Sequence, residues 1–337
     1  EEDRVVTISH GGYAKTQSLS DYQAQRRGGT GRSATAVKDE DFVEHLLIAS
    51  THATILCFSN LGKVYWLKVF HIPLASRNAR GRPMVNLLPL DEGERITSIL
   101  PVEGYEEGHF IFMATARGIV KKTDMQQFAR QRSVGLRALE LEADDWLVGT
   151  AVTDGSCDVM LLSSEGKAVR FQEQAVRAMG RTARGVRGIK LGDEHRLISL
   201  IVPQADSTIL TVSEKGYGKR TDTEEFPCKG RGTKGVIAMA TTAKNGPLVG
   251  AVQVSTGDEI MLISDQGTAV RTRVEEISTL GRNTQGVRVI KTREDEKLVR
   301  LSRIVEDDDA VPEAEAAETV GSPESGVPEA NGDTGES

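Results

Sequence analysis

The hydrophobic and polar positions of this chain fall into short strand-like runs that are separated by glycine-containing turns. The clearest example begins with the apolar run Asp158-Val-Met-Leu-Leu-Ser163. The turn sequence Ser164-Glu-Gly-Lys167 follows it, and apolar and polar residues then alternate in Ala168-Val-Arg-Phe171. Two such segments joined by a Gly-containing turn predict a β-hairpin. Two further runs, at 185–191 and 197–202, complete the four short strands of a propeller blade.

This unit occurs six times along the chain. Its first glycine recurs at Gly12, Gly62, Gly118, Gly166, Gly216 and Gly267. A second glycine recurs at Gly31, Gly81, Gly135, Gly185, Gly235 and Gly286, so that the gap is 19 residues in five copies and 17 in the third. A fixed period of about fifty residues indicates a propeller-like or solenoid array. We therefore predict an all-β fold with six propeller-like blades, in which the first glycines supply the backbone geometry of hairpin turns.

The charge of the chain is distributed unevenly. The formal net charge is −7, but the last 32 residues hold eleven Asp and Glu and no Lys or Arg, which leaves 38 acids against 42 bases in residues 1–305. The end of the chain is rich in Pro, Gly, Ala, Ser and Glu and has no aromatic residue, a composition typical of disorder. We predict a mildly basic body over residues 1–305 and a disordered acidic tail over residues 306–337, an asymmetry that favours a polyanionic partner.

Several classes of site receive no support from the sequence. Three widely spaced cysteines argue against a disulfide framework, and the six histidines form no metal-ligand spacing. Gly230-Arg-Gly-Thr-Lys-Gly235 matches a dinucleotide-binding pattern, but it opens no predicted helix and the other repeats lack it. No run of about 18 apolar residues appears, so no membrane partner is expected. The chain starts without Met, and we expect it to be a piece of a longer polypeptide.

The segments around each second glycine carry the candidate chemistry. They cover residues 25–32, 77–82, 130–137, 177–190, 229–234 and 282–291. These 52 residues hold 20 of the 42 basic residues and no acid. Six acid-free basic loops in register predict a positive stripe along one edge of the array, which would bind phosphate backbones by releasing counterions. The alternative for a single arginine is an ion pair with an acid on a neighbouring strand.

The residues that we expect to contact DNA lie in these loops and on the neighbouring strands. They are Gln25, Arg26, Arg27, Gly28, Gly29, Thr30, Gly31, Arg32, Arg80, Arg82, Lys121, Lys122, Arg170, Arg181, Arg184, Arg187, Lys219, Arg220, Lys229, Arg231, Lys234, Arg271, Arg282 and Arg288. Aromatic residues make up only 4% of the chain and are absent from the loops, so stacking platforms for single strands are missing. Double-stranded DNA held by its backbone, largely without sequence reading, fits best. No catalytic set or metal site can be proposed from spacing.

The stretch Gln25-Arg-Arg-Gly-Gly-Thr-Gly31 resembles the signature box of a known family, the C-terminal domains of the DNA gyrase A subunit, where it is usually written Q-R-R-G-G-K-G. The repeats over residues 1–305 resemble that domain throughout, for example in Ser59-Asn-Leu-Gly-Lys63 and Gly216-Tyr-Gly-Lys-Arg220. One departure is Thr30, which stands where the family has Lys and removes one potential phosphate contact. An acidic tail is also a family feature.

The resemblance implies a six-bladed β-pinwheel whose neighbouring blades exchange strands and whose basic rim wraps duplex DNA. It further implies a domain without catalytic residues or a cofactor of its own. In the family, the full enzyme combines two A and two B subunits and uses ATP and Mg²⁺ to introduce negative supercoils. Its expected place is the bacterial cytoplasm, in association with the nucleoid.

Two alternatives remain open from the sequence. The topoisomerase IV C-terminal domain is similar but lacks an intact box, so that residues 25–31 argue against it. A propeller that serves as a protein-interaction scaffold has Gly-rich repeats of similar size, but it has no need of acid-free loops in register.

Overall fold

The computed structural model describes residues 2–18, 37–38, 43–76, 79–266, 268–293 and 295–304. Within these residues each repeat contributes four strands, and repeats two to six also contribute one or two short 3-10 turns. The predicted all-β fold of six propeller blades is confirmed. The box at 25–31 and the acidic tail lie outside the described residues.

The first two strands of every repeat form the predicted hairpin. The first strands are β1 (Asp3–Ser9), β5 (Thr54–Ser59), β9 (Phe110–Thr115), β13 (Asp158–Ser163), β17 (Thr208–Ser213) and β21 (Glu259–Ser264). The second strands are β2 (Tyr13–Ser18), β6 (Lys63–Lys68), β10 (Ile119–Asp124), β14 (Lys167–Gln172), β18 (Tyr217–Asp222) and β22 (Thr268–Arg273). The turn between them requires a left-handed residue, as at Gly166, whose φ is +83°.

The third strands have two residues each and the fourth strands are longer. The third strands are β3 (Val37–Lys38), β7 (Arg82–Pro83), β11 (Leu136–Arg137), β15 (Val186–Arg187), β19 (Val236–Ile237) and β23 (Val287–Arg288). The fourth strands are β4 (Val43–Ser50), β8 (Ile96–Val102), β12 (Leu147–Thr153), β16 (Leu197–Ile201), β20 (Leu248–Val254) and β24 (Leu298–Ile304). The 3-10 turns are η1 (Val69–His71), η2 (Met84–Asn86), η3 (Met125–Phe128), η4 (Glu173–Ala175), η5 (Thr223–Glu225) and η6 (Val274–Glu276).

Neighbouring blades exchange strands, as the family resemblance implied. Each blade contains the fourth, first and second strands of one repeat, in that order. Its outermost strand is the third strand of the next repeat. Blade 1 is β4-β1-β2-β7, and blade 4 is β16-β13-β14-β19. Blade 6 is β24-β21-β22-β3, so that its outermost strand comes from the first repeat and closes the ring.

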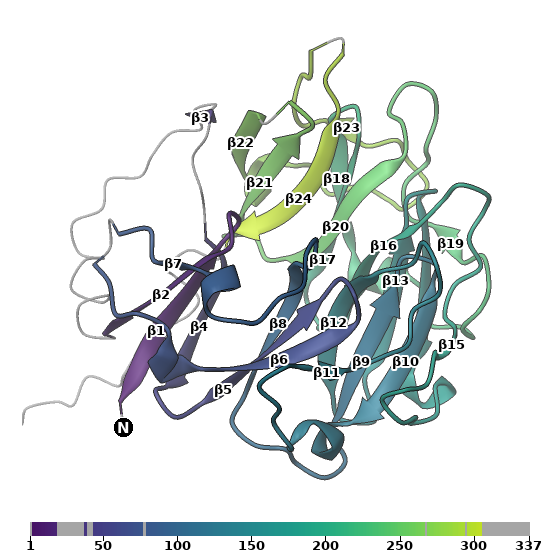
Figure 1. Cartoon of the computed structure of the whole chain (residues 1–337). Helices are drawn as coiled ribbons and strands as arrows, with labels where there is room; N and C mark the ends of the chain where they lie inside the picture. Colours follow the sequence, from purple (N-terminus) through teal and green to yellow (C-terminus); the bar gives the residue numbers. More distant parts are fainter. Residues whose placement is uncertain are drawn as a thin grey trace, which may run out of the picture.

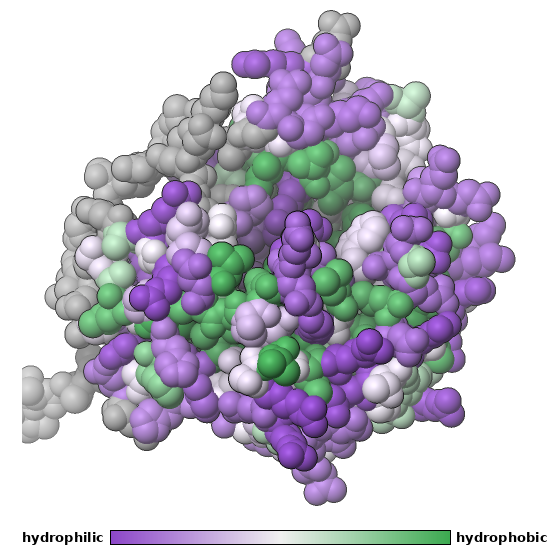
Figure 2. Space-filling view, viewed as in Figure 1, coloured by the Kyte–Doolittle hydropathy of each residue, from purple (hydrophilic) through white to green (hydrophobic). Residues whose placement is uncertain are grey.

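The blades follow the chain around the molecule, and β24 returns to β4 (Figure 1). The fourth strands contact one another in sequence and form the inner side of the ring, which leaves the exchanged third strands at its outer edge. Apolar residues fill the spaces between successive blades, as in the core shared by Phe112, Leu161 and Phe171. In Figure 2 hydrophilic residues project at the periphery, and apolar residues show between the blades.

Candidate nucleic-acid interface

The basic loops lie on the outer edge of the ring. In repeats two to six, where the structure describes it, the loop leaves its own repeat, crosses the second strand of the preceding blade and ends in the exchanged strand. Single bridges fix the crossings, among them Lys122 to Ala178 and Arg170 to Cys228. The second glycine of the repeat is required at the end of the crossing. A Cβ atom on Gly235, for example, would lie 2.2 Å from the carbonyl oxygen of Ala168.

Thirteen cationic side chains of these loops are exposed in the part of the chain that the structure describes. We call them the rim cations. They are Arg80, Arg82, Arg130, Arg132, Arg137, Arg177, Arg184, Arg187, Lys190, Lys229, Lys234, Arg288 and Lys291. They come from repeats two to six, and the corresponding loop of the first repeat, with Gln25–Arg32, lies outside the described residues. The structure therefore brings basic side chains of five repeats to the same outer edge.

Some rim cations have acidic or aromatic neighbours that the linear sequence does not reveal. Arg184 lies 3.5 Å from a carboxylate oxygen of Glu140 and 3.4 Å from one of Glu142, both of which precede β12. The guanidinium of Arg80 lies over the ring of Tyr13, and that of Arg288 lies over Tyr217. The loops are acid-free in sequence, but their surroundings in space are mixed. The alternative of pairing with a neighbouring acid applies to Arg184.

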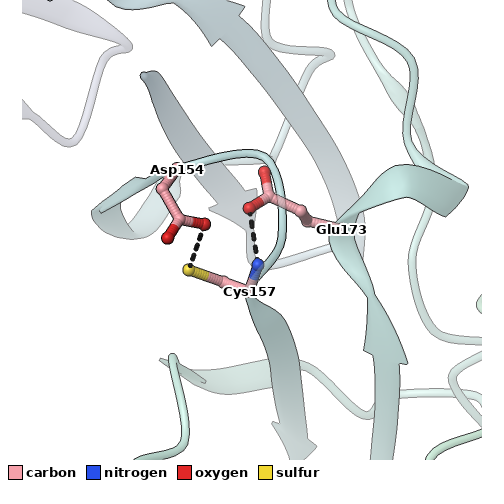
Figure 3. Close-up of side chains that lie close together, drawn as sticks. All are labelled: Asp154, Cys157 and Glu173. Carbon is pink, nitrogen blue, oxygen red and sulfur yellow. Dashed lines mark hydrogen bonds between the residues drawn. The ribbon is translucent and has the colours of Figure 1, made fainter. Parts of the chain in front are cut away.

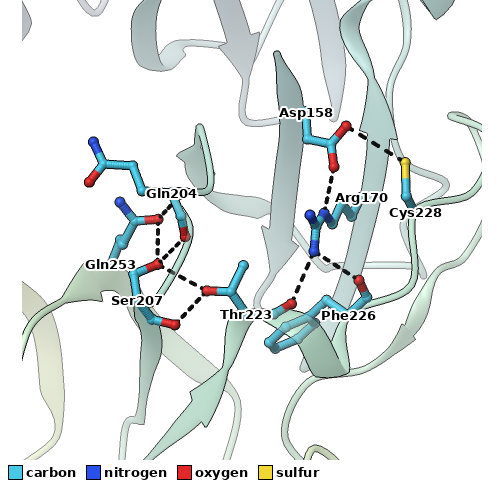
Figure 4. A network of polar contacts seen from close by, with 8 residues as sticks. All are labelled: Asp158, Arg170, Gln204, Ser207, Thr223, Phe226, Cys228 and Gln253. Carbon is cyan, nitrogen blue, oxygen red and sulfur yellow. Dashed lines mark hydrogen bonds and ion pairs between the residues drawn. The ribbon is translucent and has the colours of Figure 1, made fainter. Parts of the chain in front are cut away.

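A second group of predicted DNA contacts, on the second strands, joins one blade to the next. Arg170 donates from Nη1 to the carbonyls of Thr223 (3.1 Å) and Phe226 (3.3 Å), at the η5 turn of the following repeat (Figure 4). Arg220 likewise donates to the backbone carbonyl of Ile277 at 2.7 Å, and Lys122 donates to the backbone carbonyl of Glu173 at 3.3 Å. At the same strand position, Trp66 of blade 2 donates to the carbonyl of Phe128, and Thr16 of blade 1 donates to the carbonyl of Ile72. This position is a repeated staple between blades.

Two of the staple cations, and Arg271 at the same strand position of blade 6, also neutralise buried or half-buried carboxylates. Lys122 lies 3.3 Å from the fully buried carboxylate of Glu173, and Arg170 lies 2.8 Å from that of Asp158. Arg271 pairs with Glu259 on the adjacent strand. The charges of these residues are thus already balanced within the protein.

Lys121 and Lys219, also expected at the DNA interface, are completely buried. The ammonium of Lys121 donates to the carbonyls of Ala138, Gly180 and Arg181 at 2.5 to 3.1 Å. That of Lys219 donates to the carbonyls of Gly281 and Arg282 and to the Thr284 hydroxyl. Burial lowers the pKa of Lys121 to about 7 and that of Lys219 to about 8, and nearby Arg181 and Arg282 add to the shifts. Both lysines hold basic loops onto their blades, and burial keeps them away from any molecule bound at the surface.

Arg181, Arg231 and Arg282 are half-buried and sit between rim and interior. Arg231 donates to the carbonyls of Ala175 and Arg187, and Arg282 donates to that of Ile237. These contacts join consecutive basic loops. The guanidinium groups of Arg231 and Arg282 therefore position the loops beside which the rim cations lie.

One group of potential metal ligands occurs among the described residues, at Asp154, Cys157 and Glu173 (Figure 3). Its acceptor atoms already have donors. Glu173 accepts from the Cys157 amide at 2.9 Å and from the Thr153 hydroxyl at 2.8 Å, and it pairs with Lys122. Asp154 accepts from the amide and hydroxyl of Ser156 and from the Cys157 thiol. This network anchors the η4 turn to β13, and we assign it no metal.

Sequence reasoning missed the stapling role, although a signal for it exists. The fourth residue of the second strand is Thr16, Trp66, Lys122, Arg170, Arg220 or Arg271 in successive repeats. Tryptophan and the cations share an N–H group that can donate a hydrogen bond. A position occupied by both therefore indicates a donor to a fixed carbonyl rather than a phosphate contact. No described helix is both long and apolar enough to cross a membrane.

Comparison with known proteins agrees with this architecture. The family model of the DNA gyrase C-terminal domain, a β-propeller, matches residues 3–50, 53–103, 109–154, 158–204, 207–255 and 258–304. The DNA gyrase A subunit of Pseudomonas aeruginosa is 55% identical over 369 residues, which cover 95% of this chain and 40% of that protein. The DNA gyrase A subunit of Escherichia coli K12 is 57% identical over 306 residues, which cover 91% of this chain and 35% of that protein. The chain thus spans well under half the length of these relatives.

Two solved structures share the fold. The crystal structure of the C-terminal domain of DNA topoisomerase IV matches with a TM-score of 0.78 at 26% identity, covering 90% of this chain and 93% of that one. A structure of the DNA gyrase A C-terminal domain matches with a TM-score of 0.67 at 26% identity, covering 90% and 100%. The propeller is common to both enzymes, whereas the family model and the sequence relatives are those of gyrase. Six matched repeats and relatives above one-half identity lead to one conclusion: the chain belongs to the family of C-terminal domains of the DNA gyrase A subunit.

Proposed function

We propose that this domain binds duplex DNA along the rim cations and bends it around the outer edge of the ring. The observation that carries the proposal is the gathering of thirteen exposed Lys and Arg side chains, from five repeats, at one edge of a closed body. Cations at that edge neutralise phosphates and release counterions, which gives affinity without sequence reading. Bending a site of 20–30 bp by 40–90° costs on the order of 1–6 kcal/mol, so several loops must act together.

The role that follows is that of a DNA-wrapping domain in a gyrase. In the complete enzyme, the A and B subunits together would use ATP and Mg²⁺ to introduce negative supercoils, in the bacterial cytoplasm and in association with the nucleoid. The wrapping domain itself would supply neither the catalytic residues nor a cofactor. Its contribution would be to hold a bent DNA segment so that strand passage has a preferred direction.

A topology assay tests the proposal. The full chain is bound to nicked circular DNA, the nick is ligated, and the change in linking number is measured alongside affinity at several salt concentrations. We expect a linking-number change and a steep salt dependence, with log K falling by about 0.9 per phosphate contact for each log unit of salt. Two results would contradict wrapping by a multi-loop rim. One is binding that leaves the linking number unchanged, and the other is a salt dependence of log K that corresponds to only one or two phosphate contacts.

The box at Gln25–Gly31 extends this proposal to the first repeat. Replacing Arg26 and Arg27 by Ala is expected to reduce affinity modestly, because the cations of repeats two to six remain, but to abolish the linking-number change. Thr30→Lys restores the family's charge and is expected to increase wrapping slightly. If the double variant constrains supercoils as well as the parent chain, the box does not close the wrap.

A further inference from the structure

In blades 1, 2, 3 and 5 a side chain at the third position of the second strand holds the crossing loop to its blade, whereas blades 4 and 6 carry valine at this position, Val169 and Val270. In blades 1, 3 and 5 the residue is Lys15, Lys121 or Lys219, and its ammonium donates to carbonyls of the crossing loop. In blade 2 it is Tyr65, whose ring lies against Gly135 in the crossing loop. In blade 4 it is Val169, which packs into the apolar core and has no polar head group.

The loop of blade 4 is held in a different way. The amide of Gly232 donates to the carbonyl of Gly188 at 2.6 Å, so that the loop backbone makes the connection to the preceding blade itself. This contact uses a left-handed conformation at Gly232, whose φ is +74°. The corresponding residues of the loops on blades 3 and 5 are Thr182 and Asn283, which have no positive φ. Blade 4 thus replaces a buried ammonium by a glycine turn.

A notch of about 270 Å³ lies between β14 and this loop. Its lining includes Val169 and Arg170 from β14 and Lys229 and Lys234 from the loop. Arg170 is fixed by Asp158 and by the carbonyls of η5 (Figure 4). Lys229 and Lys234 are exposed, and neither forms an ion pair with any residue that the structure describes. The notch therefore holds two ammonium groups that are available to an anion, beside a guanidinium whose charge Asp158 already balances.

We propose that this notch is a discrete phosphate-binding site, which seats one phosphodiester of bound duplex DNA at blade 4. The inference rests on the proposed function, because it takes the DNA backbone as the source of the phosphate. A phosphate held by two lysine side chains in a recess has a defined position, whereas contacts to single rim cations can shift along the backbone. The site would fix the register of the DNA on the ring without reading its sequence.

The native thiol of Cys228 reports on occupancy of the notch. Cys228 is exposed, directly precedes Lys229 and has its Sγ 3.8 Å from a carboxylate oxygen of Asp158. In a Cys157→Ser background the remaining cysteine, Cys57, is buried in the core. Alkylation by N-ethylmaleimide then measures access to Cys228, with linear plasmid DNA as the probe. We expect bound DNA to slow the alkylation.

Replacing Lys229 and Lys234 together by Ala should abolish this protection at DNA concentrations at which a gel shift still shows a complex. It should also reduce the salt slope of binding by about 1. A matched double variant, Arg95→Ala with Lys297→Ala, removes two exposed cations that directly precede the inner strands β8 and β24. We expect it to leave both protection and slope unchanged.

The outcomes separate the inference from the function on which it rests. Protection of Cys228 that persists in the Lys229 and Lys234 double variant, or its absence in a parent chain that binds DNA, overturns the notch and leaves rim binding intact. Equal loss of protection in both double variants also overturns it, because the effect would then follow net charge alone. If the parent chain gives no gel shift, the proposed function fails and the notch fails with it.

Discussion

Lys121 and Arg187 lie on paired strands of blade 3, and their side chains have different surroundings. Lys121 is fully buried and donates to three carbonyls, whereas Arg187 is exposed on the exchanged strand β15. The difference arises because the blades pack face to face, so that a second strand has both of its faces covered. Even the consecutive residues Lys121 and Lys122 are therefore both buried.

Substitution of these two residues should separate stability from binding. Lys121→Met leaves buried carbonyls without a donor, which we expect to lower the free energy of unfolding by on the order of 2–4 kcal/mol. Urea unfolding measures this loss, and the salt slope of DNA binding should not change. Arg187→Met is the control on the same blade, and it should leave stability within about 0.5 kcal/mol of the parent while reducing the salt slope by about 1. The reverse pattern would contradict the assignment.

At the residue scale, the sequence could identify the exposed cations of the rim, but it could not identify which of the other basic residues are buried. The acid-free loops correctly located Arg187, Lys229 and Lys234 at an exposed edge. Alternation within a single strand normally sends one of two adjacent residues to solvent, and on that basis the charge of Lys122 indicates a phosphate contact. Its actual partner, Glu173, lies in another repeat and could be found only from the three-dimensional packing.

At the scale of the element, the hairpins were predictable from local pattern and the exchange was not. Both strands of a hairpin are adjacent in sequence, and their turn carries a glycine signal. The exchanged strands have only two residues, as in β15 (Val186–Arg187), and they pair with a strand of the preceding blade. The longer strand predicted over 185–191 ends early because Gly188 donates to the carbonyl of Gly118 in the hairpin turn. Only the family resemblance indicated the exchange.

Two glycines of one loop test how the exchanged strand is held. Gly235 has a φ of +76° and lies where a Cβ atom would be 2.2 Å from the Ala168 carbonyl, next to the β14–β19 pairing. We expect Gly235→Ala to cost at least ~1–2 kcal/mol of unfolding free energy from the backbone alone, with the steric contact adding to it. A Cβ atom on Gly230 would meet no other atom within 4 Å, so Gly230→Ala is the matched control and should be nearly neutral. Equal effects of the two substitutions in thermal unfolding would rule out this role for Gly235.

At the scale of the whole molecule, the ring is closed by two connections between its ends. The first is the pairing of β3 with β22, which carries a strand of the first repeat into blade 6. The second is a polar seam between β4 and β24, centred on the largely buried carboxylate of Glu44. This carboxylate lies 2.7 Å from a guanidinium nitrogen of Arg300 and accepts from the Ser302 hydroxyl at 2.7 Å. At the seam between blades 2 and 3 the comparable contact joins the uncharged hydroxyls of Ser98 and Thr150.

The charge of Glu44 makes ring closure dependent on pH. Burial opposes its ionisation, but the hydrogen bond to His10 and the charge of Arg300 outweigh burial and lower the pKa of Glu44 from 4.5 to about 2. Because the folded-state pKa lies below the unfolded one, the stabilisation is complete above pH 4.5 and is lost as the pH falls towards 2. The shift corresponds to on the order of 3 kcal/mol at neutral pH.

Glu44→Gln should remove this contribution and its pH dependence together. We expect the variant to be less stable than the parent chain by roughly 2–3 kcal/mol at pH 7, and the difference to shrink steadily between pH 4.5 and pH 2. Denaturant unfolding of both proteins across this range measures the difference, which cancels the titration of all other carboxylates. Glu140→Gln is the control, since the pair of Glu140 with Arg184 is exposed and should contribute no more than ~1 kcal/mol. A difference between Glu44→Gln and parent that stays constant with pH would show that the seam does not depend on the charge of Glu44, and closure would then rest on the β3–β22 pairing and apolar packing alone.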